Sequence, residues 1–330
     1  MAYHKEFQRK LLYEMIRIRR FEEKAGQMYG LRKIGGFCHL YNGQEAVAVG
    51  TVSALDMAKD YVLTGYRDHG HALACGMEPK EIMAELYGKI TGSSRGKGGS
   101  MHLFDEKRHF LGGNGIVGAQ IPIATGVAFA QKYRADGGVT VVFFGDGAIH
   151  QGAFHESLNM AKIWELPVIY ACENNQFGMG TSWKRVSSVS DFSVMGAGYG
   201  IPGKQVDGMD VLAVHEAFKE AAESARNGLP VFLEVKTYRY KGHSMSDPQK
   251  YRSKDEVEVY RNKDPIQSFQ ERLEKEKQIS KKEVELMEAE IDAIVEDSVA
   301  FAESSPEPSL PVLYDDVYAG PYPRAALEGR

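Results

Sequence analysis

The chain has 330 residues, 43% of them hydrophobic and 26% charged, so it can fold around a sizeable core. Its formal net charge of -5 argues against a nucleic acid or a membrane surface as partner, because both attract basic faces. No run of about 18 apolar residues could span a bilayer. Cys38, Cys75 and Cys172 are far apart in the chain, which is typical of reduced thiols in a cytosol-like compartment.

The N-terminal segment does not have the composition of a targeting sequence. Basic residues such as Arg17 and Arg20 are interrupted by acidic ones such as Glu14 and Glu22. Transit peptides are poor in acidic residues, so we expect a bacterial cytoplasmic protein. A mature chain from an organellar matrix is the alternative.

The first half of the chain predicts helices around one glycine-rich loop. Apolar residues at steps of four and three predict an amphipathic helix from Phe7 to Met28. A second helix is expected over 45–55 and a short strand over 61–64. Pro79 is expected in the first turn of another helix, where its missing N–H costs nothing. The stretch 93–118 is dense in glycine, and we expect a loop whose backbone approaches another group closely.

The middle of the chain predicts a parallel sheet. Two continuous apolar runs, 139–144 and 167–172, are typical of strands that are buried on both faces. The segment between them carries an apolar stripe and predicts a crossover helix, which makes a right-handed strand–helix–strand unit. A further strand is expected over 231–237, followed by a polar segment, 238–252, that we expect to be a mobile loop.

The fold class that these elements predict is α/β, with a mostly parallel sheet sandwiched by helices, an N-terminal helix and a C-terminal helical extension. Capping boxes at Ser253/Glu256 and Ser280/Glu283, and Asp264-Pro265 as a cap and first turn, predict the starts of the C-terminal helices. Prolines after Ser304 predict an extended tail. We therefore divide the chain into an N-terminal helical segment (1–55), an α/β domain (56–252) and the C-terminal helices with the tail (253–330).

The most informative motif begins at Asp146, which stands between two glycines directly after the strand expected over 139–144. Open α/β sheets bind ligands at the carboxyl ends of their strands. Gly147 removes a side chain where phosphate oxygens would approach, and the helix expected to begin after it would point free N–H groups at an anion. The motif therefore predicts an anion site that contains one carboxylate.

A pair of asparagines completes the motif. Residues 148–173 suffice for one helix and one return strand, so Asn175 should reach the end of the neighbouring strand on the same edge. Asp146, the amide oxygen of Asn175 and the carbonyl oxygen of Phe177 would then supply hard oxygen ligands for Mg²⁺ bound with a diphosphate. A bare Gly-Asp-Gly is often only a strand end, but the correctly spaced asparagines make a coincidence a poor alternative.

This spacing resembles the signature of the thiamine-diphosphate enzymes, which is Gly-Asp-Gly followed by Asn or Asn-Asn. Further segments resemble the alpha subunits of 2-oxo-acid dehydrogenases, in particular the pyruvate dehydrogenase (acetyl-transferring) type. The likeness extends roughly over residues 7–305. The segments that carry it are 36–41, Tyr66-Arg67, 97–102, 113–118 and 238–248.

The resemblance implies thiamine diphosphate and Mg²⁺ as cofactors, with Asp146, Asn175 and the Phe177 carbonyl as metal ligands. The further cofactor-binding residues that it implies are Tyr66, Arg67, Gly147, Ala148 and His243 towards the diphosphate, and the backbone of Gly115 and Val117 at the aminopyrimidine. The planar fork of Arg67 matches two phosphate oxygens. The alternatives are a surface charge at Arg67 and a core residue at Tyr66.

Two histidines are the candidate catalytic residues. The resemblance places His39 near the substrate, where an imidazole would steady the carboxylate of a 2-oxo acid; a structural histidine is the alternative. His243 lies in the polar loop and is expected to act in cofactor closure or in lipoyl acetylation. Ser244 matches a serine that is phosphorylated in mitochondrial relatives, but Lys250 precedes Tyr251 where a second such serine would be. We therefore expect no regulatory kinase in the host.

The function that the resemblance implies is oxidative decarboxylation of pyruvate, with transfer of the acetyl unit to the lipoyl group of dihydrolipoyl acetyltransferase. The chain would be the alpha subunit of the decarboxylating component. Alternatives are the acetoin and branched-chain 2-oxo-acid dehydrogenase alpha subunits. An alternative of another class is a non-catalytic assembly subunit.

The chain predicts only one sheet region for a cofactor that is held at both ends. We therefore expect an obligate beta subunit, in an alpha2beta2 assembly by analogy with the family, and the lipoyl domain of the acyltransferase as a further partner. Small side chains would allow close helix contact with the beta subunit; they are Gly118, Ala119, Ala124, Gly126 and Ala128.

Overall fold

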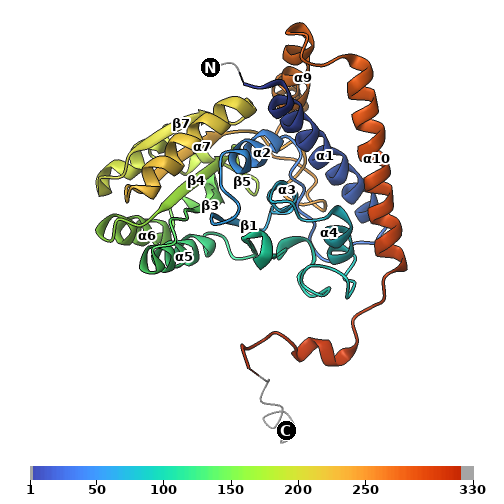
Figure 1. The fold of residues 1–330 in the computed structure, drawn as a ribbon, viewed down its shortest axis with the longest axis horizontal. Helices are drawn as coiled ribbons and strands as arrows, with labels where there is room; N and C mark the ends of the chain where they lie inside the picture. The colour runs from blue at the N-terminus through green and yellow to red at the C-terminus, as the bar shows by residue number, and fades with distance from the viewer. Residues whose placement is uncertain (1–2, 321–330) are drawn as a thin grey trace, which may run out of the picture.

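The computed structural model describes residues 3–320. Within them, a sheet of six parallel strands forms the centre of the molecule, with helices on both faces (Figure 1). In spatial order the strands are β2 (Phe110–Asn114), β1 (Tyr61–Gly65), β3 (Thr140–Gly145), β4 (Val168–Asn174), β8 (Val231–Lys236) and β7 (Gly203–Asp207). The α/β fold with a parallel sheet, expected from the sequence, is confirmed.

The inner strands bury both of their faces. Along β3, Val141 and Phe143 belong to one apolar core, whereas Val142 and Phe144 belong to the other. A strand without a solvent face has no need of polar residues, which is why it reads as a continuous apolar run. The runs 139–144 and 167–172 therefore correspond to β3 and β4.

The helices form a layer on each side of the sheet. Residues of α5 and α6 contribute to one core, and residues of α1, α2 and α7 contribute to the other. The long helix α10 runs beside α1 and past α4 (Figure 1). The bounds are α1 Lys5–Gly30, α2 Glu45–Ser53, α3 His69–Ala74, α4 Pro79–Leu86, α5 Gln120–Arg134, α6 Gly152–Ile163, α7 Val211–Arg226, α8 Lys254–Arg261, α9 Pro265–Lys275 and α10 Lys281–Ser304.

Two strands at the edges of the sheet were not predicted. β2 lies inside 93–118, which we expected to be a loop throughout, and that expectation was wrong. β2 is the outermost strand and pairs with β1 alone. It contains Gly112 and Gly113, so it has no continuous apolar run. Four of the five residues of β7 are exposed, so this strand also lacks the apolar run that would have predicted it. Edge strands need less apolar side-chain surface because part of their surface faces solvent.

The predicted starts of the three C-terminal helices are confirmed, but only one of the two predicted capping boxes is complete. Ser280 and Glu283 form a complete capping box at α10, and Asp264 accepts backbone N–H groups at α9, with Pro265 in its first turn. At α8 the side chain of Ser253 accepts the backbone N–H of Glu256.

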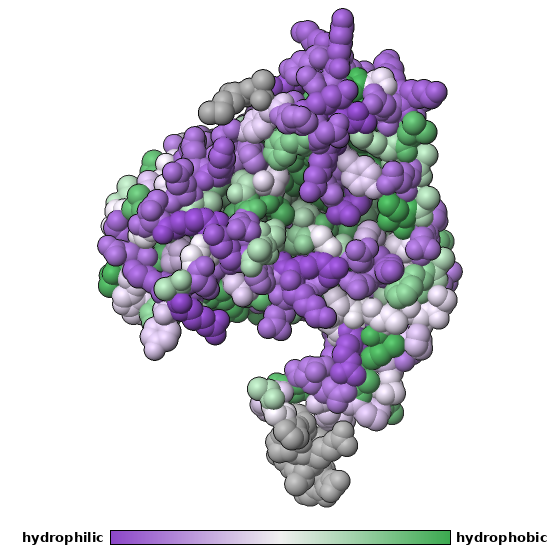
Figure 2. Space-filling model, viewed as in Figure 1, coloured by the Kyte–Doolittle hydropathy of each residue, from purple (hydrophilic) through white to green (hydrophobic). Residues whose placement is uncertain are grey.

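The tail after Ser304 is only partly extended, because Leu310–Tyr314 forms a 3-10 helix. Figure 2 shows the tail running away from the body of the molecule. Residues 321–330, the rest of the expected tail, lie outside the described residues. Segment 238–252 forms neither helix nor strand, and its mobility stays a prediction.

The sequence predicted reduced cysteines and no segment that spans a membrane. All three cysteines are buried and unpaired, as expected of reduced thiols. Over residues 3–320, every helix is too short or too polar to cross a bilayer.

Candidate functional site

The residues singled out in the sequence gather at one edge of the sheet, where the parallel strands end. Strands β1, β3, β4 and β8 are successive neighbours, so the loops that leave them share this edge. After each strand come the following candidates: Gly115 and Val117 after β2, Tyr66 and Arg67 after β1, Asp146, Gly147 and Ala148 after β3, Asn175 and Phe177 after β4, and His243 after β8.

Asp146 and Asn175 lie side by side. Gly145 pairs with Glu173 in the sheet register, so Asp146 leaves β3 next to the end of β4. Asp146 is only 4% exposed. Burial raises the pKa of its carboxyl to about 7, against the opposing effects of Arg239 and of a backbone hydrogen bond from Asn175. The structure therefore brings together the acid and the amide that the spacing of the motif joined.

The turn after Asp146 differs from the expectation in one respect. We expected a helix to begin directly after Gly147, but Asp146–Ala148 forms a 3-10 turn and α6 begins only at Gly152. A side chain at Gly147 would bring its Cβ within 3.3 Å of the Cα of Gly178. Gly178 belongs to β5 (Phe177–Gly178), which pairs with β6 (Thr181–Ser182). The glycine is therefore needed for the close approach of two backbones.

Arg239 lies at the same point, although no role was predicted for it. Its side chain is buried, and Nη1 donates to the carbonyl oxygen of Phe177 at 3.2 Å. The same Nη1 lies 3.5 Å from Oδ1 of Asn175. Two of the three oxygens predicted to bind Mg²⁺ thus face one buried cation, which shows that they turn towards a common position. The position of Arg239 directly after strand 231–237, on the same edge, was the signal that could have identified it.

A second buried guanidinium belongs to Arg67. It donates to the carbonyl oxygens of Leu40 and His243, both at 2.7 Å. Burial lowers the pKa of Arg67 to about 10, and the nearby charge of Arg239 acts in the same direction. Within residues 3–320, neither arginine has a carboxylate at ion-pair distance. Two buried positive charges without a counter-ion fit an anionic ligand such as a diphosphate.

The two candidate histidines lie together with Tyr66. The ring centroid of His39 is 4.6 Å from that of Tyr66 and 5.2 Å from that of His243. Burial, and secondarily the charge of Arg67, lowers the pKa of His39 to about 2 and that of His243 to about 4. Both imidazoles are therefore neutral at pH 7. In the described part of the chain, neither buried Nδ1 has a hydrogen-bond partner, so both remain able to bind a ligand.

The loop that carries His243 is folded back onto the site by arginine side chains. Arg252 donates to the carbonyl oxygens of Arg239, Tyr240 and Lys241. Tyr251 connects Arg239 to Asp247, which in turn accepts the backbone N–H of His243. The loop and the metal-ligand candidates are thus connected through Arg239.

Gly115 and Val117 lie in the segment that joins β2 to α5. Val117 and its neighbour Ile116 are exposed. Our expectation that Ala124 and Ala128 contact a partner was wrong, because both are buried in this chain's own core. They lie on the inner face of α5. The exposed side of the helix carries large apolar residues instead, namely Ile123, Phe129 and Tyr133.

The donor set also indicates what kind of metal would fit. Among the described residues, no group of three or more His, Cys, Asp and Glu side chains is arranged to hold a metal. A metal at Asp146 would therefore depend on one carboxylate with amide and carbonyl oxygens. Such hard oxygens suit Mg²⁺, which commonly binds through one or two carboxylates and the phosphates of its ligand.

Open α/β folds bind their ligands at the carboxyl ends of their strands, which is where these groups lie. A family model described as the dehydrogenase E1 component matches residues 13–311, and the chain belongs to this family.

Relatives are similar over nearly the whole chain. The chain is 56% identical to the pyruvate dehydrogenase E1 component subunit alpha of Rhizobium meliloti, over 96% of this chain and 91% of the relative. The corresponding subunit of Rickettsia bellii is 50% identical over 92% of this chain and 94% of its own length. A mitochondrial type I subunit of Ascaris suum is 46% identical over 92% of this chain and 76% of its own length.

Proposed function

We propose that the chain is the alpha subunit of the decarboxylating component of a pyruvate dehydrogenase complex. It would take part in oxidative decarboxylation of pyruvate and in acetyl transfer to the lipoyl group of dihydrolipoyl acetyltransferase. The similarity to pyruvate dehydrogenase alpha subunits supports this choice. The single observation that carries the proposal is the meeting of Asp146 and Asn175 at adjacent strand ends, beside two buried arginines that have no counter-ion among residues 3–320. The comparisons do not favour the acetoin, branched-chain or assembly alternatives.

The metal and the diphosphate are assigned to the charged groups at the strand ends. Asp146, Asn175 and the Phe177 carbonyl would hold Mg²⁺. Arg67 would meet the diphosphate with its planar fork, after exchanging one of its present carbonyl partners for phosphate oxygens. When bound, thiamine diphosphate supplies the electron sink that allows carbon dioxide to leave a 2-oxo acid.

The other predicted residues complete the cofactor and substrate sites. Tyr66 and His243 would lie on the diphosphate side, and Gly147 and Ala148 would supply backbone to it from the 3-10 turn. The backbone of Gly115 and Val117 would meet the aminopyrimidine, because both residues follow β2, whose neighbour β1 leads to Tyr66 and Arg67.

The two histidines would act as neutral hydrogen-bonding groups. The pKa values of His39 and His243 lie well below 7, so both imidazole rings are neutral at that pH. Each ring then has one N–H donor and one nitrogen acceptor. His39 would donate such an N–H to the carboxylate of the 2-oxo acid. His243 would act in closure of the cofactor site or in acetylation of the lipoyl group, because its loop is connected to Arg239.

A beta subunit would cover an exposed apolar stretch beside this site. The exposed apolar residues Ile116, Val117, Ile123, Phe129 and Tyr133 lie between the end of β2 and the far end of α5. A stretch of chain that exposes several large apolar side chains is typical of an interface. We therefore propose an alpha2beta2 assembly, with the lipoyl domain as a transient partner. The bacterial relatives support the bacterial cytoplasm as the location.

The test is steady-state turnover of the chain reconstituted with its beta subunit, with pyruvate, acetoin and 3-methyl-2-oxobutanoate and an artificial electron acceptor. We expect the highest kcat/KM with pyruvate, by at least roughly 10-fold, because each of the two extra carbons of 3-methyl-2-oxobutanoate is worth about 1–3 kcal/mol in a pocket. Acetoin lacks the carboxylate that His39 would bind. The chain alone should have negligible activity. A preference for either other substrate, or full turnover without the beta subunit, would contradict the proposal.

A further inference from the structure

We infer that Gln44 is a positioning residue that holds the amide oxygen of Asn175 towards the metal position. The inference rests on the metal site of the proposed function. Gln44 directly precedes α2, and its side chain is 0% exposed. Its Oε1 accepts a hydrogen bond from Nδ2 of Asn175 at 3.1 Å. No role for this glutamine was predicted from the sequence.

The orientation of the Asn175 amide follows from its two neighbours. An amide presents an acceptor at one end and donors at the other, so only one of its two orientations offers an oxygen to a metal. Arg239 can only donate, and its Nη1 faces Oδ1 of Asn175. Nδ2 must then face an acceptor, which Gln44 supplies. Both neighbours select the same orientation, in which Oδ1 of Asn175 and the carbonyl oxygen of Phe177 share Arg239 as neighbour.

Gln44 makes the stronger of these two contacts. The distance from Arg239 to Oδ1 of Asn175, 3.5 Å, is at the outer limit for a hydrogen bond. Arg239 also divides its donors among the carbonyl oxygens of Phe177, Met179 and Lys241. The 3.1 Å bond to Gln44 therefore fixes the amide more firmly.

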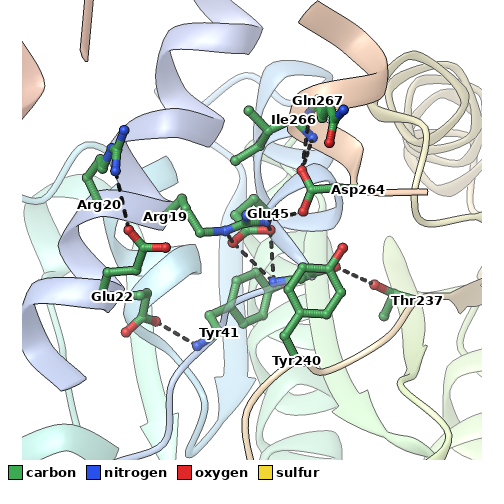
Figure 3. Close-up of polar contacts among 12 residues, drawn as sticks. Arg19, Arg20, Glu22, Tyr41, Glu45, Thr237, Tyr240, Asp264, Ile266 and Gln267 are labelled. Atoms are coloured by element: carbon green, nitrogen blue, oxygen red, sulfur yellow. Dashed lines mark hydrogen bonds and ion pairs between the residues drawn. The ribbon is translucent and has the colours of Figure 1, made fainter. Parts of the chain in front are cut away.

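The turn that carries Gln44 is itself held from the helix side. Glu45 accepts the backbone N–H of Gly43 and binds the guanidinium of Arg19, and Glu22 accepts the backbone N–H of Tyr41 (Figure 3). Ordered hydrogen bonds of this kind leave the glutamine little freedom to move away from Asn175.

The same turn is also held from the side of β8. Gly43 has a φ of +97°, and a Cβ there would lie 2.4 Å from the carbonyl oxygen of Tyr238. Tyr240 donates its backbone N–H to the carbonyl oxygen of Asn42 at 3.0 Å. Helix α1 and the segment after β8 thus hold the turn between them, and with it the position of Gln44.

Gln44 has no other visible task in the described residues. It occupies the N-cap position of α2, but its side chain does not cap the helix. Its Nε2 is buried, and no partner for it occurs in residues 3–320. A buried amide that is retained for one contact needs an explanation, and orientation of a metal ligand provides one.

The test measures Mg²⁺ binding by calorimetry on the chain assembled with its beta subunit and saturated with thiamine diphosphate. Gln44→Leu should raise the Mg²⁺ dissociation constant by about 10–100-fold, as is usual when the partner of a metal ligand is lost. Gln44→Glu keeps an acceptor for Asn175 and should recover most of the affinity. The matched control is Gln131→Leu, because Gln131 is also buried but bonds to Lys59 and Thr140 at the opposite ends of the strands. It should leave Mg²⁺ binding unchanged.

A double-mutant cycle separates orientation from a general loss of structure. In an Asn175→Asp background both ends of the side chain are oxygens, so orientation no longer matters. Gln44→Leu should then change Mg²⁺ affinity little. An equal loss in both backgrounds, or unchanged affinity in Gln44→Leu alone, would overturn the inference. If Gln44→Leu does not fold, the failure of Gln44→Glu to bind Mg²⁺ like the natural chain overturns it.

One further variant distinguishes the inference from the proposed function. Asp146→Asn removes the only carboxylate assigned to the metal. If it leaves Mg²⁺ binding unchanged, the metal site itself is wrong. If it weakens binding while Gln44→Leu does not, the proposed function stands and only the inference about Gln44 fails.

Discussion

Buried charges are paired differently at the two ends of the parallel strands. At the edge where the strands begin, Asp60 is fully buried, binds both ends of the Arg226 guanidinium and accepts the backbone N–H of Val139. At the edge where the strands end, Asp146 is buried without a Lys or Arg at ion-pair distance among the described residues, and Arg67 and Arg239 lack carboxylate partners. The first edge is balanced within the chain. The second edge can be balanced by ligands that the chain does not itself supply.

The buried charges that lack a partner mark the functional end of the strands. Burial of an unpaired charge costs free energy, so a chain that tolerates such charges at one edge gives up stability there. Groups with strongly shifted pKa values that converge on one place are typical of functional sites. The raised pKa of Asp146 and the lowered pKa values of His39 and His243 all occur at this edge.

The largest change in stability is expected at the balanced edge. Asp60→Asn leaves Arg226 without its counter-charge and should lower the free energy of unfolding by about 3 kcal/mol, the lower end for buried pairs. The lower end applies because the side chain of Arg226 is 26% exposed. Urea denaturation measures the effect. Mg²⁺ binding should not change, and a loss of Mg²⁺ affinity in this variant would break the comparison.

The reverse result is expected at the other edge. Asp146→Asn should weaken Mg²⁺ binding by at least about 100-fold, since loss of an outer partner alone costs about 10–100-fold. The metal-free chain should be no less stable, because an amide is cheaper to bury than a carboxylate. Calorimetry and urea denaturation of the same variant check both parts. If the variant unfolds more easily but binds Mg²⁺ normally, Asp146 stabilises the fold and does not bind the metal.

A smaller effect is expected from Asp68, which sharpens the comparison because it is buried and bonded to one backbone N–H, that of Leu103. Burial raises its pKa from 3.8 to about 7; His69 opposes the shift and Glu22 adds to it. The folded chain therefore keeps a proton that the unfolded chain releases between these values. The free energy of unfolding should fall as the pH rises through this window, by up to about 1.4 kcal/mol per pH unit.

Asp68→Asn should remove this part of the pH dependence, because the amide does not titrate. The measurement is urea denaturation of both chains at several pH values between 4.5 and 7. Parallel slopes for the variant and the natural chain would show that Asp68 does not carry the effect.

The sequence predicts the inner sheet and the core of the site for the same physical reason. β3 and β4 are apolar on both faces, and Asp146 and Asn175 are fixed by where those two strands end. The edge strands β2 and β7 lack this signal, because one contains glycines and the other is mostly exposed.

The residues that support the site were harder to predict. Gln44 and Arg239 both contact Asn175. In the chain, Gln44 is 131 positions from Asn175 and Arg239 is 64 positions from it. No local pattern encodes such contacts, since both residues lie in segments whose positions depend on the complete fold. The inner face of α5 was misjudged for a similar reason: small residues suit either a partner helix or the chain's own sheet, and only packing decides.

The most direct test of the account is a crystal structure of the assembled enzyme with thiamine diphosphate and Mn²⁺ in place of Mg²⁺, which reveals the metal by its anomalous scattering. We predict one peak within coordination distance of Asp146, of Oδ1 of Asn175 and of the carbonyl oxygen of Phe177, with the diphosphate against Arg67. A metal peak bound elsewhere, with Asp146 left uncoordinated, would contradict the central claim.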